Sequence, residues 1–215
     1  MTGASDLPEQ TQRLLTDPEA LRVHIQRVLA VRLPRTRPLP AGARKAAVLL
    51  PLVQSPGGAA LLLTQRTETV EQHKGQISFP GGGLEDGESP LDGALRETRE
   101  EIGISPADVE VLGELDDEET VVSGFLVTPI VGLVPYPSRL RLSPEEVRAV
   151  LQVPLSVLLD PQNVRTEVWE RQGERSLMYF YAAGREVIWG ATARIIARFL
   201  NVVFGTSLRT TGGAP

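Results

Sequence analysis

The segment from Ser89 to Gly103 is the part of the chain whose structure the sequence specifies most tightly. It opens with Ser89-Pro90-Leu91-Asp92, in which a serine can cap the first free amides and proline occupies the first helical position. Gly103 supplies the left-handed residue at which many helices end. Between these ends the residues that recur with the helical period define one face for burial: Leu91, Ala94, Leu95, Thr98 and Ile102. We therefore predict a helix that packs this face against a core.

Three glutamates lie on a different face of the same helix. Glu97, Glu100 and Glu101 are separated by three and four positions, so their side chains come together off the core face. Like charges at this spacing destabilise an isolated helix by about 0.2–0.5 kcal/mol per pair. A bound divalent cation would reverse that sign. A salt bridge from Arg96 to Glu100 would also relieve the repulsion, and the helix alone does not decide between the two interpretations.

The remaining elements are short and follow no regular strand–helix alternation, which predicts an α+β fold. The predicted strands cover residues 45–53, 59–66, 77–79, 109–115 and 125–134, with a late hairpin over 164–170 and 176–182. The predicted helices cover 17–32 and 190–204, with a further short helix opened by Ser143-Pro144 before Pro154. We expect one main domain over 45–204, an N-terminal helix and linker over 1–44 that pack on it, and a flexible tail over 205–215.

The composition excludes several kinds of site. There is no cysteine and there are only two histidines, His24 and His73, which rules out thiolate nucleophiles and metal sites built from cysteine or several histidines. Any metal is expected to bind carboxylates, which suit hard cations. The apolar run 46–53 contains Pro51 and is far shorter than the roughly 20 residues that span a bilayer. Without a secretory pattern at the N-terminus, we expect a cytoplasmic protein with no membrane partner.

The charge is strongly segregated along the chain. Residues 82–119 hold 14 acidic side chains and only Arg96 and Arg99 as bases, a local net charge of −12. The rest of the chain carries 20 basic and 13 acidic residues, a net charge of +7. This distribution argues against a protein that coats nucleic acid and fits a metal beside an anionic substrate. A solvated acidic face is the alternative explanation.

The acidic helix belongs to a longer motif that begins at Gly82. Gly82, five residues, Glu88, seven residues and then Arg96-Glu97-Thr98-Arg99-Glu100-Glu101-Ile102-Gly103-Ile104 resembles the Nudix box, Gly-x5-Glu-x7-Arg-Glu-U-x-Glu-Glu-x-Gly-U with U aliphatic. Thr98 at the first aliphatic position is a mild departure. The resemblance implies a Nudix hydrolase domain over 45–204, with a mixed β-sheet sandwiched between α-helices. It also implies hydrolysis of a nucleoside diphosphate linked to another moiety.

The resemblance also implies a metal site that uses Mg²⁺ or Mn²⁺. Its ligands would be Glu97 and Glu101, with a backbone carbonyl from Gly81 or Gly82. Cations held there would neutralise the charge by which a diphosphate repels attacking water. Glu100 would be a further ligand or the general base.

Two further roles around the box follow from the same resemblance. Arg96 is expected to support the catalytic residues through a salt bridge with Glu88, for which a catalytic role is the lesser alternative. In some family members the general base comes from outside the box. The sequence offers four such carboxylates and does not decide among them: Glu118, Glu119, Glu145 and Glu146.

A second motif narrows the substrate. Leu62-Leu63-Thr64-Gln65-Arg66-Thr67, Gly75 and Phe79-Pro80-Gly81-Gly82 resemble the coenzyme A pyrophosphatase signature, and residues 188–194 resemble the end of those proteins. The implied reaction converts coenzyme A or an acyl derivative to 4'-phosphopantetheine and adenosine 3',5'-bisphosphate. Two positions depart from the signature: Thr67 replaces a serine or alanine, and Glu71 replaces an arginine.

These motifs also predict the residues that bind substrate. Arg66 is expected to contact a substrate phosphate, because a guanidinium matches phosphate oxygens. A salt bridge of Arg66 with Glu68 or Glu71 is the structural alternative. Since Glu71 reverses a charge in the signature, Lys74 or His73 is expected to supply the missing phosphate contact.

Three rival functions remain open. The chain could be a Nudix enzyme for another substrate, such as ADP-ribose or a nucleoside triphosphate. It could be a catalytically silent Nudix fold that binds a ligand, although such a protein is expected to lose box carboxylates and this chain keeps them. A calcium-binding module at 116–119 is the third, but it lacks the alternating oxygen ligands. We expect a small-molecule substrate and no nucleic acid, with monomer and homodimer both possible.

Overall fold

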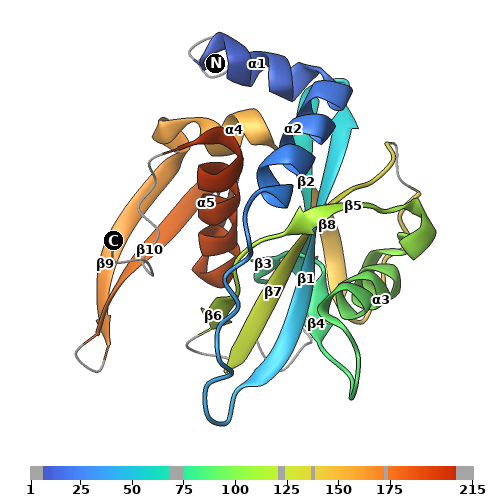
Figure 1. Ribbon diagram of the computed structural model, residues 1–215, viewed down its shortest axis with the longest axis vertical. Coiled ribbons are helices and arrows are strands. Elements are labelled where there is room, and N and C mark those ends of the chain that lie inside the picture. The colour runs from blue at the N-terminus through green and yellow to red at the C-terminus, as the bar shows by residue number, and fades with distance from the viewer. Residues whose placement is uncertain (1–6, 68–74, 121–123, 137–138, 172–173, 207–215) are drawn as a thin grey trace.

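The computed structural model describes residues 7–67, 75–120, 124–136, 139–171 and 174–206. Its strands form an eight-stranded and a three-stranded sheet (Figure 1). The larger sheet contains β1 (Arg44–Ser55), β2 (Gly58–Arg66), β3 (Ile77–Ser78), β4 (Gly81–Gly83), β5 (Glu110–Glu114), β6 (Glu118–Thr120), β7 (Phe125–Leu133) and β8 (Val147–Pro154). The smaller contains β9 (Val164–Arg171), β10 (Glu174–Ala183) and β11 (Glu186–Trp189). The helices are α1 (Glu9–Thr16), α2 (Pro18–Ala30), α3 (Pro90–Ile102), α4 (Leu155–Leu159) and α5 (Gly190–Phe204), with short 3₁₀ helices η1 (Pro106–Asp108) and η2 (Pro161–Asn163).

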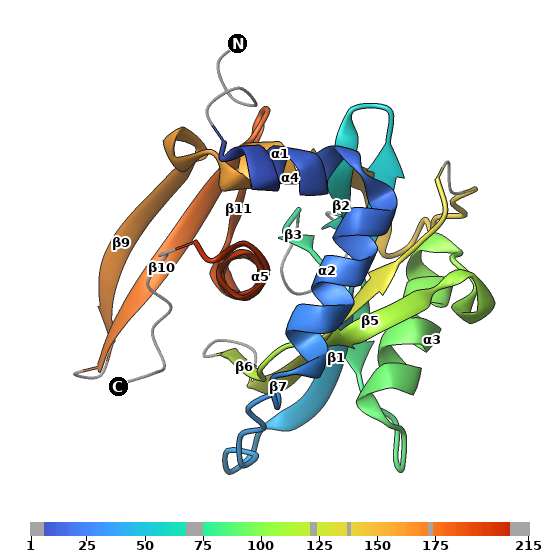
Figure 2. The same cartoon turned by 45° about the horizontal axis from the view of Figure 1, so that its top comes forward.

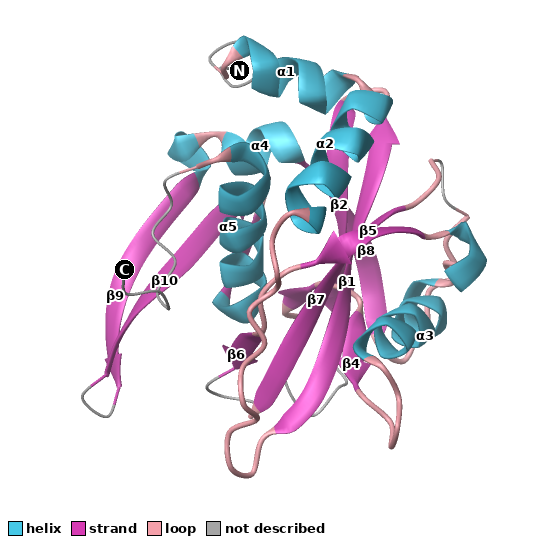
Figure 3. Cartoon of the chain, in the orientation of Figure 1, coloured by secondary structure: helices cyan, strands magenta, loops and turns pink. Residues whose placement is uncertain are grey.

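The larger sheet is mixed and lies between helices, which confirms the predicted α+β class (Figure 3). Its strand order is β3-β2-β1-β7-β5, with β4 also paired to β1, β6 to β7 and β8 to β2. β1 and β7 run parallel, and the other pairs are antiparallel. α3 covers one face, while α2 and α5 lie on the opposite side (Figure 2).

The continuous apolar run of β1 reflects burial on both faces of the sheet. Ala47 and Leu49 pack with Ala94 of α3, whereas Leu50 and Leu52 belong to the larger cluster that includes α2 and α5. A strand covered on both sides needs no polar alternation. The site described below lies where β1, β4 and α3 meet.

The predicted helix ends are present. The Asp92 amide donates to Ser89 Oγ at 3.1 Å, and Gly103 ends α3 with a φ of 77°. Asp17 likewise caps α2, accepting from the Ala20 amide at 2.9 Å. Within the described ranges, no helix is both long and apolar enough to cross a membrane.

The helix predicted after Ser143-Pro144 is wrong. The chain closes a single turn there, with the amides of Glu146 and Val147 donating to the Ser143 carbonyl, and continues as β8. β8 pairs with β2 from Ala60↔Pro154 to Arg66↔Val147. Hydrogen bonding to a strand far away in sequence therefore outweighs the local capping motif. The acidic loop expected at 116–119 also ends in a short strand, β6.

The three-stranded sheet contains the predicted late hairpin. β9 and β10 pair antiparallel, and β11, which the sequence analysis did not predict, adds to the other side of β10. One face of this sheet packs on α5 through Tyr179, Tyr181 and Ile188, all at most 1% exposed. The terminal helix itself begins and ends where predicted.

Candidate metal and catalytic site

The glycines of β4 allow α3 to lie directly against its backbone. A Cβ at Gly81 would stand 2.3 Å from the Ala47 carbonyl oxygen, and the φ of Gly81 is +150°. A Cβ at Gly82 would stand 2.6 Å from the Glu97 Cδ. Side chains at either position would collide with the neighbouring strand or with the carboxylate. The glycines therefore bring Glu97 onto the β4 backbone.

Arg96 joins the loop before α3 to the helix itself. Its Nε and one terminal nitrogen donate to the Glu88 carboxylate at 2.8 and 2.9 Å, so the predicted ion pair is confirmed. The same guanidinium donates to Glu97 at 2.8 Å, to the Gly83 carbonyl at 3.2 Å and to Glu100 at 3.3 Å. One arginine thus fixes the positions of three carboxylates and of the β4 end.

This pairing changes the ionisation of Glu88. Hydrogen bonds from Arg96, followed by one from the Glu85 amide at 2.9 Å, lower the pKa of Glu88 to about 2. The same contacts raise the pKa of Arg96 above its usual value. The pair is therefore fully charged at neutral pH.

Glu101 is buried, and the expectation that it lies off the core face is wrong. Only 4% of the residue is exposed, because β4 and the turn after residue 140 cover this end of α3. The Gly81 amide donates to its carboxylate at 3.3 Å, and the Ser143 amide donates to its carbonyl at 2.9 Å. A guanidinium nitrogen of Arg66 lies 4.0 Å from the same carboxylate.

Burial raises the pKa of Glu101 to about 8. The positive charge of Arg66 opposes this rise, and the negative charges of Glu97 and Glu146 add to it. The raised pKa means that the positive charge around Glu101 is too small to stabilise its ionised form. A cation between Glu97 and Glu101 would supply it.

The donor set fits a hard divalent cation. Glu97 lies against Gly82 and Glu101 is hydrogen-bonded to Gly81, so both carboxylates converge on β4. The described part of the chain holds no group of three or more acidic or histidine side chains arranged as a metal site. Mg²⁺ is commonly held by one or two carboxylates and completes its coordination with water and substrate phosphate. A backbone carbonyl of β4 would be a further oxygen donor.

The other predicted residues differ in how close they come to this cluster. Arg66 ends β2 beside Glu101, and its buried Nε has no hydrogen-bond partner within the part of the chain that the structure describes. Glu100 has half of its side chain exposed, at 51%. His73 and Lys74, the proposed phosphate contacts, lie outside the described residues, as do Glu68 and Glu71.

The four candidate general bases outside the Nudix box differ in their burial and in their partners. Glu118 is buried and ion-paired with Arg194 and Arg198, and Glu119 is exposed on β6. Glu145 and Glu146 are exposed in the turn before β8, where their carbonyls accept from Thr67 at the end of β2. Of these four, Glu146 is the one whose charge acts on Glu101.

The acidic loop before β6 contains an ion-pair network that was not predicted from the sequence. Asp116 accepts from Arg198 at 3.0 Å, from the Arg35 amide at 2.8 Å and from the side chain of Arg32. Burial alone would raise the pKa of Asp116, but these donors outweigh it and lower the pKa. The partners are about 80 positions away in sequence, so no local pattern indicates them. The network joins the segment after α2 and helix α5 to the central sheet.

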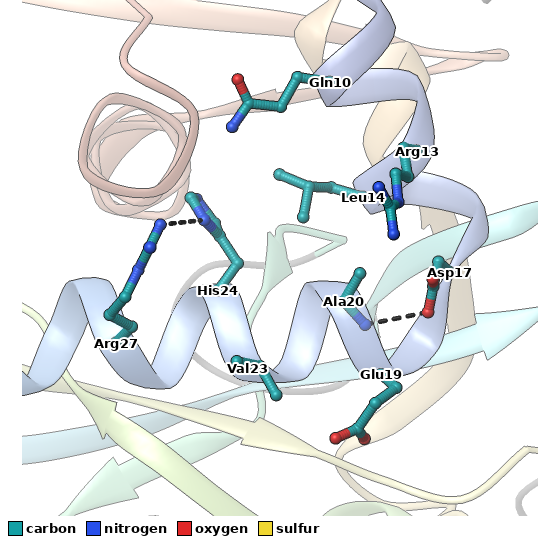
Figure 4. Close-up of a pocket in the computed structure, with 9 residues that line it drawn as sticks. All are labelled: Gln10, Arg13, Leu14, Asp17, Glu19, Ala20, Val23, His24 and Arg27. Atoms are coloured by element: carbon teal, nitrogen blue, oxygen red, sulfur yellow. Dashed lines mark hydrogen bonds between the residues drawn. The ribbon is translucent and has the colours of Figure 1, made fainter.

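A shallow pocket of about 470 Å³ lies between α1 and α2 (Figure 4). It contains none of the predicted catalytic or metal-binding residues. His24 on its wall has its Nε2 2.7 Å from the Val203 carbonyl of α5, and its Nδ1 3.5 Å from Arg27. These contacts give His24 a structural role between two helices.

Comparisons with known proteins show which proteins are similar to this chain in sequence and in fold. The family model described as NUDIX domain matches residues 43–165. The protein named "Uncharacterized Nudix hydrolase NudL" from Photorhabdus laumondii is 41% identical over 161 residues, which cover 74% of this chain and 85% of that protein. The protein of the same name from Escherichia coli K12 is 40% identical over 154 residues, or 71% and 79% of the two chains. Among solved structures, a MutT/nudix family protein from Enterococcus faecalis aligns over 95% of this chain and 77% of its own, with a TM-score of 0.51 and 16% identity, which is a likeness of fold.

Proposed function

The chain belongs to the Nudix hydrolase family, whose enzymes act on pyrophosphate bonds of nucleoside diphosphate derivatives, and within it we propose that the substrate is coenzyme A or an acyl-coenzyme A. Water attacks one phosphorus of the diphosphate, and the bridging P–O bond to that phosphorus breaks. The products are 4'-phosphopantetheine, or its acyl derivative, and adenosine 3',5'-bisphosphate. One phosphate gains the oxygen of water, and the protons pass to a base and to solvent.

One observation supports this substrate above the others. The two halves of the coenzyme A signature meet at a single carboxylate of the Nudix box, that of Glu101. Arg66, from the first half, lies 4.0 Å from it, and Gly81, from the second half, donates its amide to it at 3.3 Å. Residues of the substrate motif and of the catalytic motif therefore share one site.

The buried Nε of Arg66 would donate a hydrogen bond to a phosphate of the substrate. This nitrogen is enclosed and has no hydrogen-bond partner among the described residues. A donor in that state gains most when it meets a charged acceptor such as a phosphate oxygen. Arg66 would hold one phosphate of the substrate beside Glu101.

Nudix hydrolases generally use divalent metal ions, and in this chain Glu97 and Glu101 would hold one with a carbonyl of Gly81 or Gly82. Such an ion would supply positive charge that offsets the charges of the diphosphate and of the two carboxylates. Arg96 keeps Glu97 in place through its 2.8 Å hydrogen bond. Mg²⁺ and Mn²⁺ both suit such oxygen ligands.

We assign the general base to Glu146. Glu146 is exposed, it lies in the turn whose Ser143 amide donates to the Glu101 carbonyl at 2.9 Å, and its negative charge adds to the rise in the pKa of Glu101. Glu100 is the alternative, but it is engaged by Arg96 at 3.3 Å. Replacement of the base should lower kcat and remove the acidic limb of the pH–rate profile, so Glu146→Gln and Glu100→Gln distinguish the two.

Product analysis tests the substrate. The full chain is incubated with Mg²⁺ and either coenzyme A or ADP-ribose, and the products are identified by mass spectrometry after reaction in ¹⁸O water. We expect a higher kcat/KM for coenzyme A, with ¹⁸O in one of its two product phosphates. A higher kcat/KM for ADP-ribose would contradict the proposal and would identify Glu71 as the sign of a different substrate class.

A further inference from the structure

The three-stranded sheet presents an aromatic face that no described element covers. Both tryptophans of the chain lie on it, Trp169 at 47% and Trp189 at 43% exposed, with Val187 at 50%. Phe180 pairs with Trp189 across the strands, and its ring centroid lies 6.2 Å from that of Trp169. α5 occupies the other face (Figure 2). An apolar patch of this kind is typical of an interaction surface.

The same sheet has an open edge at β9. In the described structure, β9 pairs with β10 on one side and with no strand on the other (Figure 1). Its sequence, VRTEVWER, contains no proline, and its charged side chains are of both signs, so they do not exclude a strand that carries the opposite charges. The edge therefore offers unpaired backbone groups to another strand.

The charges on β9 fit a second copy of the same strand. A twofold axis perpendicular to the sheet pairs β9 with itself antiparallel and keeps both α5 helices on one face. Centred on Thr166, this register places Arg165 opposite Glu167 twice. Centring on Arg165 or on Glu167 would instead place like charges directly opposite, which is unfavourable.

We propose that two copies of this chain associate through their β9 edges, in antiparallel register centred on Thr166, to form one continuous six-stranded sheet.

The exposed apolar residues of β9 gain neighbours in this register. Val168, 56% exposed, lies opposite Val164 of the second copy. Trp169 extends beyond the paired residues toward η2 of the second copy, where Pro161 and Gln162 are exposed. Arg165 and Glu167, with side chains 63% and 38% exposed, pair with each other within the strand, and Arg165 also lies over the Phe180 ring while Glu167 accepts from Trp169; in the dimer they would exchange their mutual contact for one across the interface. The proposal is independent of the substrate.

A charge swap tests both the interface and its register. The mass of the full chain is measured by sedimentation velocity over a dilution series, with wild type expected at twice 23.3 kDa at the higher concentrations. Arg165→Glu and Glu167→Arg each create like charges across the axis and should raise the dissociation constant at least about ten-fold. The double variant Arg165→Glu/Glu167→Arg restores opposite charges and should dimerise nearly as well as wild type.

Arg185→Glu is the matched control, because it makes the same charge change on an exposed residue of the β10–β11 turn. It should dimerise like wild type, and thermal unfolding checks that every variant is folded. Wild type that stays monomeric overturns the proposal. A dimer that resists both single swaps, that Arg185→Glu weakens equally, or that the double variant does not restore also overturns it.

Discussion

At the scale of single residues, one arginine offsets the negative charges of several carboxylates in the site. Arg96 is bonded to Glu88, Glu97 and Glu100, so the repulsion expected on the α3 surface is largely relieved before any metal binds. The salt-bridge and metal interpretations of this face are therefore compatible. Glu101 is the exception, since Arg66 approaches no closer than 4.0 Å and the pKa of Glu101 stays high.

The ion pair between Glu88 and Arg96 should make the free energy of unfolding depend on pH in the acidic range. The pKa of Glu88 falls from 4.5 to about 2 in the folded chain, so it contributes stability above pH 4.5 and loses it as the pH falls toward 2. We expect Glu88→Gln to be less stable than wild type at neutral pH, with the difference shrinking across that window. Urea unfolding at a series of pH values measures it. A difference that does not change between pH 4.5 and 2 would contradict the assigned linkage.

At the scale of elements, the sequence predicted structure wherever the signal was local. α3 carries its cap, its apolar face and its terminal glycine within one segment, and it was predicted to within a residue or two. β8 depends on pairing with the distant β2, so its local pattern was misassigned, whereas α1 and β11 pack mainly against their neighbours in sequence and were missed because their own patterns are weak. Similarly, the resemblance to the Nudix box implied the Arg96–Glu88 pair, whereas the burial of Glu101 required the turn at 143–146, about 40 positions later.

The close contact of β4 with α3 leads to a prediction about its glycines. Gly82→Ala would place a Cβ 2.6 Å from the Glu97 Cδ, so the flexible carboxylate must move while the fold survives. We expect kcat to fall about 10- to 100-fold, since a shift of about 1 Å in a catalytic group has effects of this size. Gly83→Ala is the control, because its Cβ would meet only Phe125 at 3.8 Å and should leave turnover nearly unchanged. Equal activity in the two variants would argue against Glu97 as a ligand.

At the scale of the whole molecule, the acidic loop before and within β6 holds the segment after α2 and helix α5 on the sheet. Arg32 follows α2, Arg198 belongs to α5, and both contact Asp116. The strongly negative segment 82–119 is thus partly neutralised by bases from outside it. This explains why the segregation of charge along the sequence does not persist in the fold.

Loss of Arg198 should therefore destabilise the whole chain. It leaves Asp116 and Glu118 each without one charged partner, and hydrogen bonds to charged groups contribute about 1.5–3 kcal/mol. We expect Arg198→Met to lower the free energy of unfolding by about that amount, with Arg185→Met as the exposed control. Urea denaturation followed by circular dichroism measures both. Equal stabilities of the two variants would show that the network contributes little.

If Glu97 and Glu101 hold the metal on which hydrolysis depends, variants that keep the size of these side chains and lose their charge should lose turnover. The measurement is kcat for coenzyme A at saturating Mg²⁺ in Glu97→Gln, Glu101→Gln and the exposed control Glu114→Gln, with folding checked by circular dichroism. Loss of a metal ligand should lower kcat at least about 100-fold, equivalent to about 2.7 kcal/mol of transition-state stabilisation, and the control should match wild type. Near-normal turnover in either site variant would contradict the account.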